Sequence, residues 1–484
     1  MTQTIKSISQ PKLSLNILTP EEVKQIHTTT LDVIESVGVR FPSQKALDIL
    51  EAHDAQVDRV SMIARIPGHI VEEYLAMMPP TYTLAACDRG LDLPLDGKYS
   101  HLGTDGCGVE ILDAFNGMLR RSTKQDVMDV ARVADYLEGI AFHWVPISAQ
   151  DCPPQSRSLH ELQAIWQVSK KHVQTESVVT EKEARAAVEM AALLAGGREA
   201  LRRRPLLSIM QCTTSPLAQD GGSLEAGLVA AEAGLPVGYM TMASSGSTGP
   251  ITLAGNLVVG NAEVISALVL MQMAYPGCPV YYAAAQTITD LRTGAYTGGG
   301  PEDYLFGAAT NVISDFYNIP LSMGAYATGA KEPDWQAAVD NSLSAFMAVS
   351  TLSDMLLGAG LLHGSRIFSY DELLLDCEIW SILHSMFQGI VVNEETLAFD
   401  TIQKVGPGGN FLGQKHTRQY MRQRWQPTLM DRRPYEQWNA KKDGARQWAR
   451  EKAQHILSDY HPEPLEPGLL KELDKIISHI EKDE

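Results

Sequence analysis

PVGYMTMASSGSTGPITLAGNLVVGNAEV, residues 236–264, contains an apolar run, a turn of small polar residues, a proline and a long apolar segment that has no charge before Glu263. A continuous apolar run fits a strand of a parallel sheet, because both faces of such a strand are covered. The proline and the apolar residues after it are typical of the start of a helix. The stretch therefore predicts one strand, one turn and one helix.

Similar apolar runs recur along the chain, and each leads into a helical segment. They start about 30 to 45 residues apart, which is the length of one strand, one helix and the return loop. Eight such units predict an α/β fold, a (β/α)8 TIM barrel. The alternative is an open, doubly wound sheet, which needs a nucleotide-binding loop that we do not find after the first strand. The predicted strands are 140–148, 172–179, 206–217, 236–244, 279–286, 320–328, 354–360 and 389–393.

The barrel is expected to occupy residues 136–400. Residues 1–135 mix amphipathic helices with short strands and predict an N-terminal extension packed on the barrel. One helix is expected to begin after Thr19, because a capping side chain is followed by a proline and by acids in the first turn. Residues 401–484 are polar, basic in patches and helical, which indicates a cap or a contact in a homo-oligomer.

Composition argues against several classes of function. The net charge is −18, whereas binding to nucleic acid or to an anionic membrane needs clustered Lys and Arg. The six cysteines are dispersed without the Cys/His spacing of a zinc or iron–sulfur site, so we expect no metal. The N-terminus lacks the apolar core of a signal peptide, and no apolar run reaches membrane-spanning length. We therefore expect a cytoplasmic protein.

In a barrel of this type, function collects in the loops that follow the carboxyl ends of the strands. These positions are rich in amides, hydroxyls and aromatic side chains and hold few acids. The residues found there are His143, Trp144, Glu176, Gln211, Ser244 to Thr248, Gln286, Arg292, Tyr326, Lys331, His363 and Arg366.

Glycine-rich loops follow several of the predicted strands. One holds Gly246 and Gly249, the next spans residues 294–305, and a third spans 405–411. A phosphate-binding loop normally adds Lys or Arg to the backbone N–H groups, and residues 240–264 contain neither. Glycines also let the backbone lie close to a large flat ligand or a docked protein. The three loops predict a broad contact surface on one rim of the barrel.

Four separated motifs resemble signatures of the trimethylamine methyltransferase superfamily, whose members pass a methyl group from an amine to a corrinoid protein. The resemblance implies a (β/α)8 barrel whose rim accepts the cobalamin domain of a partner. All 484 positions are standard residues, so the chain is similar to the members without pyrrolysine, such as the glycine betaine and carnitine methyltransferases. The motifs are GPITLAGNLVVGNAEV (249–264), DLRTGAYTGGGPE (290–302), GAYATGAKEPDWQ (324–336) and NEETLAFDTIQKVGPGGNFLGQKHT (393–417).

The resemblance implies a quaternary amine, such as glycine betaine, as the substrate. A quaternary ammonium is already cationic and leaves as a neutral tertiary amine. Attack by Co(I) on a methyl carbon therefore needs orientation and electrostatics rather than a catalytic side chain. No tightly bound cofactor is expected, because the cobalamin belongs to the partner corrinoid protein. The glycines expected to face the corrinoid are Gly246, Gly249, Gly298, Gly299, Gly408 and Gly409.

A betaine has a cationic head and a carboxylate tail. Aromatic faces and a carboxylate suit the head, for which Trp144 and Tyr282 are also available. Cationic side chains suit the tail, although Arg292 could instead pair with Glu302 or Asp303 to hold its loop. The expected substrate-binding residues are Asp105, Glu176, Gln211, Gln286, Arg292, Tyr326, Lys331, His363, Arg366 and Phe368.

Two other functions stay open. A lyase or aldolase-type barrel would use Lys331 as a Schiff-base nucleophile. A barrel without catalytic activity would bind a betaine as a sensor or storage module. A zinc-type methyltransferase is disfavoured, because it needs a His/Cys/Cys ligand set that the spacing does not offer.

Overall fold

The structure, a computed structural model, describes residues 3–9, 15–106 and 108–482. Its centre is a barrel of eight parallel strands, closed by the pairing of its first strand with its last. The predicted (β/α)8 TIM barrel is therefore confirmed. The barrel strands are β7 (Tyr99–Thr104), β10 (Ile140–Trp144), β11 (His172–Thr175), β12 (Leu207–Cys212), β13 (Val237–Thr241), β15 (Val280–Ala284), β17 (Leu321–Gly324) and β18 (Met355–Ala359).

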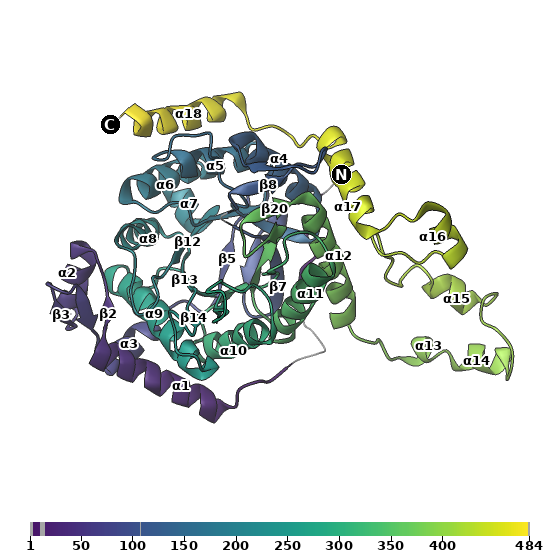
Figure 1. Cartoon of the computed structure of the whole chain (residues 1–484), viewed down its shortest axis with the longest axis horizontal. Coiled ribbons are helices and arrows are strands. Elements are labelled where there is room, and N and C mark those ends of the chain that lie inside the picture. The colour runs from purple at the N-terminus through teal and green to yellow at the C-terminus, as the bar shows by residue number, and fades with distance from the viewer. Residues whose placement is uncertain (1–2, 10–14, 107, 483–484) are drawn as a thin grey trace.

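Helices follow the strands and form a ring around them (Figure 1). Helix α9 is long and apolar enough to cross a membrane by length and composition, yet 83% of its most apolar window is buried inside the protein. Such burial is what the core helix of a globular fold requires. The ring consists of α4 (Lys124–Tyr136), α5 (Arg157–Trp166), α6 (Glu181–Ala195), α7 (Arg198–Arg203), α8 (Gly221–Ala233), α9 (Leu253–Ala274), α10 (Pro301–Tyr317), α11 (Trp335–Ser350) and α12 (Tyr370–Phe387).

The strand predicted at residues 389–393 is wrong. Ile390, Val391 and Val392 form an apolar run, but they are 82%, 60% and 70% exposed and belong to no strand. The missing barrel strand is Tyr99–Thr104, which lies in the segment expected to form the N-terminal extension. Its sequence, YSHLGT, is not an apolar run, and its strand conformation depends on partners on both sides. The division of the chain at residues 135 and 400 stays a prediction.

A hairpin fills the N-terminal end of the barrel. Strands β5 (Tyr82–Leu84) and β6 (Leu93–Leu95) pair antiparallel. Their leucines join Phe142, Met210 and Tyr281, which project from the barrel strands, in one core cluster. The polar interior of the barrel therefore lies toward the opposite end, where the strands finish.

The N-terminal residues wrap the outside of the barrel. Helix α1 (Pro20–Asp32) begins as predicted, because the side chains of Thr19 and Glu22 and their backbone N–H groups form a reciprocal cap. The helix packs on α9. The other elements of this region are β1 (Ile8–Ser9), a π-helical turn (Val33–Val37), β2 (Val39–Arg40), α2 (Gln44–Ala52), β3 (Gln56–Asp58), β4 (Ile63–Arg65), α3 (Gly68–Leu75) and a 3-10 turn (Arg89–Leu91).

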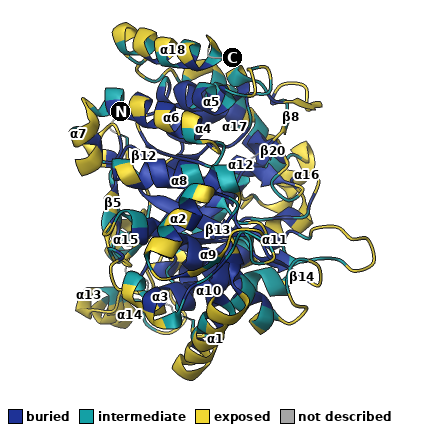
Figure 2. Cartoon of the chain, turned by 90° about the vertical axis from the view of Figure 1, so that its left-hand side faces the viewer, coloured by how far each residue is buried: buried dark blue, intermediate teal, exposed yellow. Residues whose placement is uncertain are grey.

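Short strands and a protruding segment complete the molecule. Two small sheets cover the end of the barrel where the strands finish: β14 (Ser244–Ser245) with β16 (Thr287–Ile288), and β8 (Glu110–Leu112), β9 (Leu119–Arg121), β19 (Leu361–Leu362) and β20 (Ile367–Ser369). Beyond α12 residues 389–424 leave the barrel (Figure 1) and are mostly exposed (Figure 2), and the last two helices of the chain pack back on α12 and α6. The C-terminal helices are α13 (Glu394–Leu397), α14 (Phe399–Val405), α15 (Lys415–Tyr420), α16 (Tyr435–Lys441), α17 (Ala445–Asp459) and α18 (Pro467–Lys482).

Glu263, the first charge of α9, ties that helix to the barrel. One carboxylate oxygen accepts hydrogen bonds from the hydroxyls of Thr213, Ser215 and Thr241, and the other accepts one from the backbone N–H of Leu217. Burial raises the pKa of Glu263, and these hydrogen bonds oppose the rise. The carboxylate therefore joins α9 to β13 and to the loop after β12.

Glu263→Ala should lower the free energy of unfolding by roughly 3 kcal/mol or more, because one buried and three half-buried donors lose their acceptor. Glu263→Gln keeps one carbonyl oxygen and should cost about 1 kcal/mol. Urea unfolding followed by circular dichroism measures both. If the alanine and glutamine variants lose equal stability, the hydrogen bonds are not what holds this helix.

Candidate active site

Glu176 follows strand β11 inside the barrel. It shares a face of the strand with Gln174, whose side-chain amide contacts the interior sulfur of Met210. Both carboxylate oxygens of Glu176 are buried and have no hydrogen-bond partner among the described residues. Burial, with a smaller contribution from the charge of Asp105, raises the pKa of Glu176 to about 8. An unpaired buried carboxyl group of this kind is costly and is a candidate for ligand binding.

Asp105 lies beside Glu176, at the end of strand β7. Its carboxylate accepts hydrogen bonds from the Ser365 hydroxyl at 2.5 Å and from the backbone N–H of Gly106 at 2.9 Å. Burial raises its pKa to about 6, against the effect of these two bonds. The two carboxyl groups thus differ: Asp105 has partners, and Glu176 has none among the described residues.

Cys212 and Tyr281 belong to the same interior. Burial raises the pKa of each, and the charge of Glu176 raises both further, which places the thiol and the phenol within electrostatic range of that carboxylate. The ring of Trp144 lies against Gly106, where a Cβ would come within 2.4 Å of it. Glycine is therefore required for the ring to lie flat at the end of β10. The compartment combines one unpaired carboxyl group with aromatic side chains.

Tyr296 lies above this compartment. Its ring is 3.1 Å from the position that a Cβ on Gly364 would take. Desolvation raises the pKa of Tyr296, and the charges of Asp303 and Asp105 raise it further. The loop that follows β16 therefore brings an aromatic side chain over the barrel mouth.

The two predicted amides point away from the barrel interior. Gln211 donates a hydrogen bond to the carbonyl of Val178 at 2.8 Å, and Gln286 donates to the backbone and side-chain oxygens of Asn256 on α9. Both amides therefore hold loops or helices in place in this structure. Their role in substrate binding stays a prediction.

Two predicted aromatic residues lie behind the barrel wall. Burial raises the pKa of Tyr326, and the charges of Asp376 and Cys377 on α12 raise it further, so this phenol lies near α12. Phe368 is fully buried and packs edge-on against Tyr370, with ring centroids 5.1 Å apart. Neither ring therefore lies in the compartment that contains Glu176.

The four predicted cations lie on the surface of the rim. The side chain of Arg292 is 92% exposed and is 3.7 Å from Asp290, rather than paired with Glu302 or Asp303. Arg366 binds Glu110 at 2.9 Å. Lys331 is exposed and donates to the carbonyl of its neighbour Gly329, and the His363 side chain is exposed. A role for any of the four in holding a carboxylate tail stays a prediction.

At two of the predicted glycines, contacts within the protein leave no room for a side chain. A Cβ on Gly299 would come within 2.3 Å of the Asp340 side chain, and one on Gly298 within 2.8 Å of the Thr328 backbone. Gly246 and Gly249 lie in the loop between β14 and α9. Gly408 and Gly409 lie between α14 and α15, in the protruding segment, so the expected third loop is not on this rim.

Sequence reasoning missed Cys212 and Tyr281 and selected Tyr282 instead. Tyr281 joins the interior cluster, whereas Tyr282 joins the core outside the barrel strands. Both residues are buried, and the strand VYYAA is apolar throughout. The sequence contains no alternation that would reveal which tyrosine faces inward.

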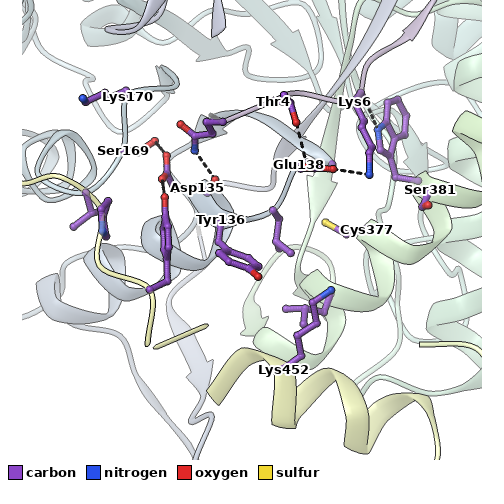
Figure 3. Close-up of a pocket in the computed structure, with 18 of the residues that line it drawn as sticks. Thr4, Lys6, Asp135, Tyr136, Glu138, Ser169, Lys170, Cys377, Ser381 and Lys452 are labelled. Carbon is purple, nitrogen blue, oxygen red and sulfur yellow. Dashed lines mark hydrogen bonds and ion pairs between the residues drawn. The ribbon is translucent and has the colours of Figure 1, made fainter. Parts of the chain in front are cut away.

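A cavity of about 820 Å³ lies at the other end of the barrel (Figure 3). It is bounded by the N-terminal segment, the ends of α4 and α5, and α12 and α17. Its carboxyl groups have partners: Asp135 accepts from Ser169 at 2.6 Å, and Glu138 pairs with Lys6 at 2.5 Å. Catalytic residues of such barrels lie at the opposite end, so we place the site at the mouth that contains Glu176.

Comparisons with known proteins agree with this barrel. The profile of the family described as trimethylamine methyltransferase (MTTB) matches residues 1–483. The trimethylamine methyltransferase MttB of Desulfitobacterium hafniense is 35% identical over 464 residues, which cover 95% of this chain and 93% of the relative. A glycine betaine methyltransferase of Desulfitobacterium hafniense is 32% identical over 466 residues, which cover 96% of each chain.

A solved structure shares the fold. The monomethylamine methyltransferase MtmB of Methanosarcina barkeri superposes with a TM-score of 0.53 at 11% identity, over 90% of this chain and 92% of that one. The family profile spans nearly the whole sequence, and named methyltransferases more than 30% identical to it match almost end to end. The chain therefore belongs to the trimethylamine methyltransferase family and is a methyltransferase.

Proposed function

We propose that this methyltransferase moves a methyl group from a quaternary amine, glycine betaine or a related betaine, to Co(I) of a corrinoid carried by a separate protein. The observation that carries the proposal is the carboxyl group of Glu176, which is buried at the barrel mouth without a partner among the described residues. A cation without N–H donors suits this site, because it can neutralise the carboxylate without a directional hydrogen bond.

Aromatic side chains add to the attraction. The ring of Trp144 lies against Gly106, next to Asp105, and the phenol of Tyr281 lies within electrostatic range of Glu176. Both rings could present their faces to a trimethylammonium group, at about 0.5 to 2 kcal/mol for each contact. With Glu176 they would orient the head and exclude water from it. Tyr296 would cover the bound amine from the rim.

The chemistry needs little else from the chain. Co(I) of the partner supplies the nucleophile, and the C–N bond breaks with its electron pair leaving on nitrogen as a neutral tertiary amine. No proton has to move at the nitrogen. All positions of the chain are standard residues, so it has no pyrrolysine to activate a tertiary amine. Orientation and electrostatic preorganisation are then the contribution of Glu176 and the aromatic rings.

The proposal also covers the cellular location, the oligomeric state and the cofactor of the enzyme. We place it in the cytoplasm as a homo-oligomer that binds no cofactor tightly and meets the cobalamin on its corrinoid protein. The Schiff-base alternative loses its nucleophile, since Lys331 is exposed on a loop and points back to Gly329. A barrel that only binds a betaine is distinguished by the turnover experiment below.

Cation binding should strengthen as the pH rises toward about 8, where Glu176 ionises in the empty site. Below that pH the carboxyl is protonated and neutral, so a bound cation must displace the proton, and affinity should rise by up to about tenfold for each pH unit. The rise in affinity begins at the pKa that Glu176 has in the complex, which the bound cation lowers. Calorimetry with choline in buffers of different ionisation enthalpy measures both the affinity and the proton released.

Glu176→Gln is the matched variant, because it keeps the shape and removes the ionisable group. It should weaken choline binding and abolish the pH dependence above pH 7. The neutral isostere 3,3-dimethyl-1-butanol should bind the native protein and the variant alike. A pH dependence that survives in Glu176→Gln would assign the titration to another group.

Methyl transfer should distinguish quaternary from tertiary amines. We expect glycine betaine or another quaternary amine to methylate Co(I) cobalamin at least about 100-fold faster than trimethylamine does, which corresponds to about 2.7 kcal/mol in the activation barrier. The absorbance change of cobalamin follows the reaction. Equal rates with both amines would contradict the proposal, and tight binding without any transfer would favour the non-catalytic barrel.

A further inference from the structure

Residues 389–424, which we call the arm, leave the barrel as a loop and return to the helix from which they started. The arm begins after α12 ends at Phe387. It ends where Trp425 donates a hydrogen bond to Ser381 and Thr428 donates to Glu378, both on α12. The segment between these points stands away from the barrel (Figure 1). A protrusion of 36 residues is therefore anchored at both ends on one helix.

The arm exposes an unusual number of large apolar side chains. None of the described residues of α13, α14 and α15 is buried. Helices of four to seven residues are not stable in water without packing against another surface. The exposed apolar residues of the arm are Ile390, Val391, Val392, Leu397, Phe399, Ile402, Phe411, Leu412 and Met421. Exposed apolar side chains in this number, on one protruding segment, indicate an interaction site.

Helix α11 offers a second apolar surface on the same side of the molecule. Its sequence, WQAAVDNSLSAFMAVS, contains one charged residue, Asp340, and that residue is buried. Trp335 is 80% exposed and Leu343 46% exposed. A surface helix normally carries charged residues on its outer face. Helix α11 packs against α12, the helix that carries the arm.

We propose that the arm of one copy of this chain packs on the α11 face of a second copy, and that the contact is reciprocal. Both surfaces belong to one chain, so a twofold axis covers both at once and leaves neither exposed. The arm is also long enough, since a stable interface uses about 20 to 30 residues from each partner.

Charge favours a second copy as the occupant. Residues 401–424 of the arm carry five Lys and Arg and no Asp or Glu, and the three acids of the arm precede them, whereas the whole chain has a net charge of −18. The basic part of the arm is therefore attracted to the acidic body of another copy. This inference does not depend on which amine the enzyme uses.

The test is the mass of the protein in solution as a function of its concentration, by analytical ultracentrifugation. The native chain should be a dimer or a larger assembly. Leu412→Asp in the arm and Leu343→Asp on α11 should each raise the dissociation constant at least about tenfold, because each places a charge in an apolar contact. Val60→Asp is the matched control, since Val60 is 97% exposed in the turn between β3 and β4 and should change nothing.

Circular dichroism and thermal unfolding establish that each variant is folded, and hydrogen exchange of the native chain gives a second measurement. Protection of the arm and of α11 should rise together with protein concentration. A native chain that is monomeric at all concentrations overturns the proposal. That is the result expected if the arm binds the corrinoid protein instead of a second copy. Loss of association in Leu412→Asp but not in Leu343→Asp overturns α11 as the seat of the arm.

Discussion

The closure of the barrel by strand β7 is the constraint on which the site depends. This strand pairs with β10 on one side and with β18 on the other, and β1 adds to it from outside the barrel. Closure brings the carboxyl ends of all eight strands to one rim. Asp105 directly follows β7 and Glu176 follows β11, so the closed sheet places their carboxyl groups in one compartment. An open sheet would keep both groups at one edge but would not enclose them.

In the proposed site, the fold gives up stability in favour of ligand binding. A carboxyl group buried without a partner costs free energy, and protonation lowers that cost in the empty site, which is why the pKa of Glu176 is raised to about 8. Asp105 shows the structural alternative, because hydrogen bonds from Ser365 and Gly106 offset its burial. A cationic ligand that pairs with the Glu176 carboxylate would offset the free-energy cost of burying that group without a partner. This asymmetry between two neighbouring acids distinguishes a binding group from a supporting one.

The repeated apolar runs were sufficient to predict the barrel and seven of its strands. Two errors have one cause. The run at 389–393 has strand-forming residues but no neighbouring strand to pair with, and it lies exposed. YSHLGT at 99–104 has an unpromising composition and becomes a strand because it has partners on both sides. Strand formation depends on non-local pairing, so propensity decided neither segment.

The sequence by itself determined the α/β class, the start of α1 at its Thr19 cap, and the motifs that led to the family, because these depend on local spacing and chemistry. Only the tertiary structure decided which side chains share the mouth. It turned Tyr281 inward and Tyr282 outward, left Glu176 unpaired among the described residues and paired Arg366 with Glu110. The physical reason is that strands buried on both faces are apolar throughout, so the direction of each side chain is set by the pairing of the strands in the closed barrel.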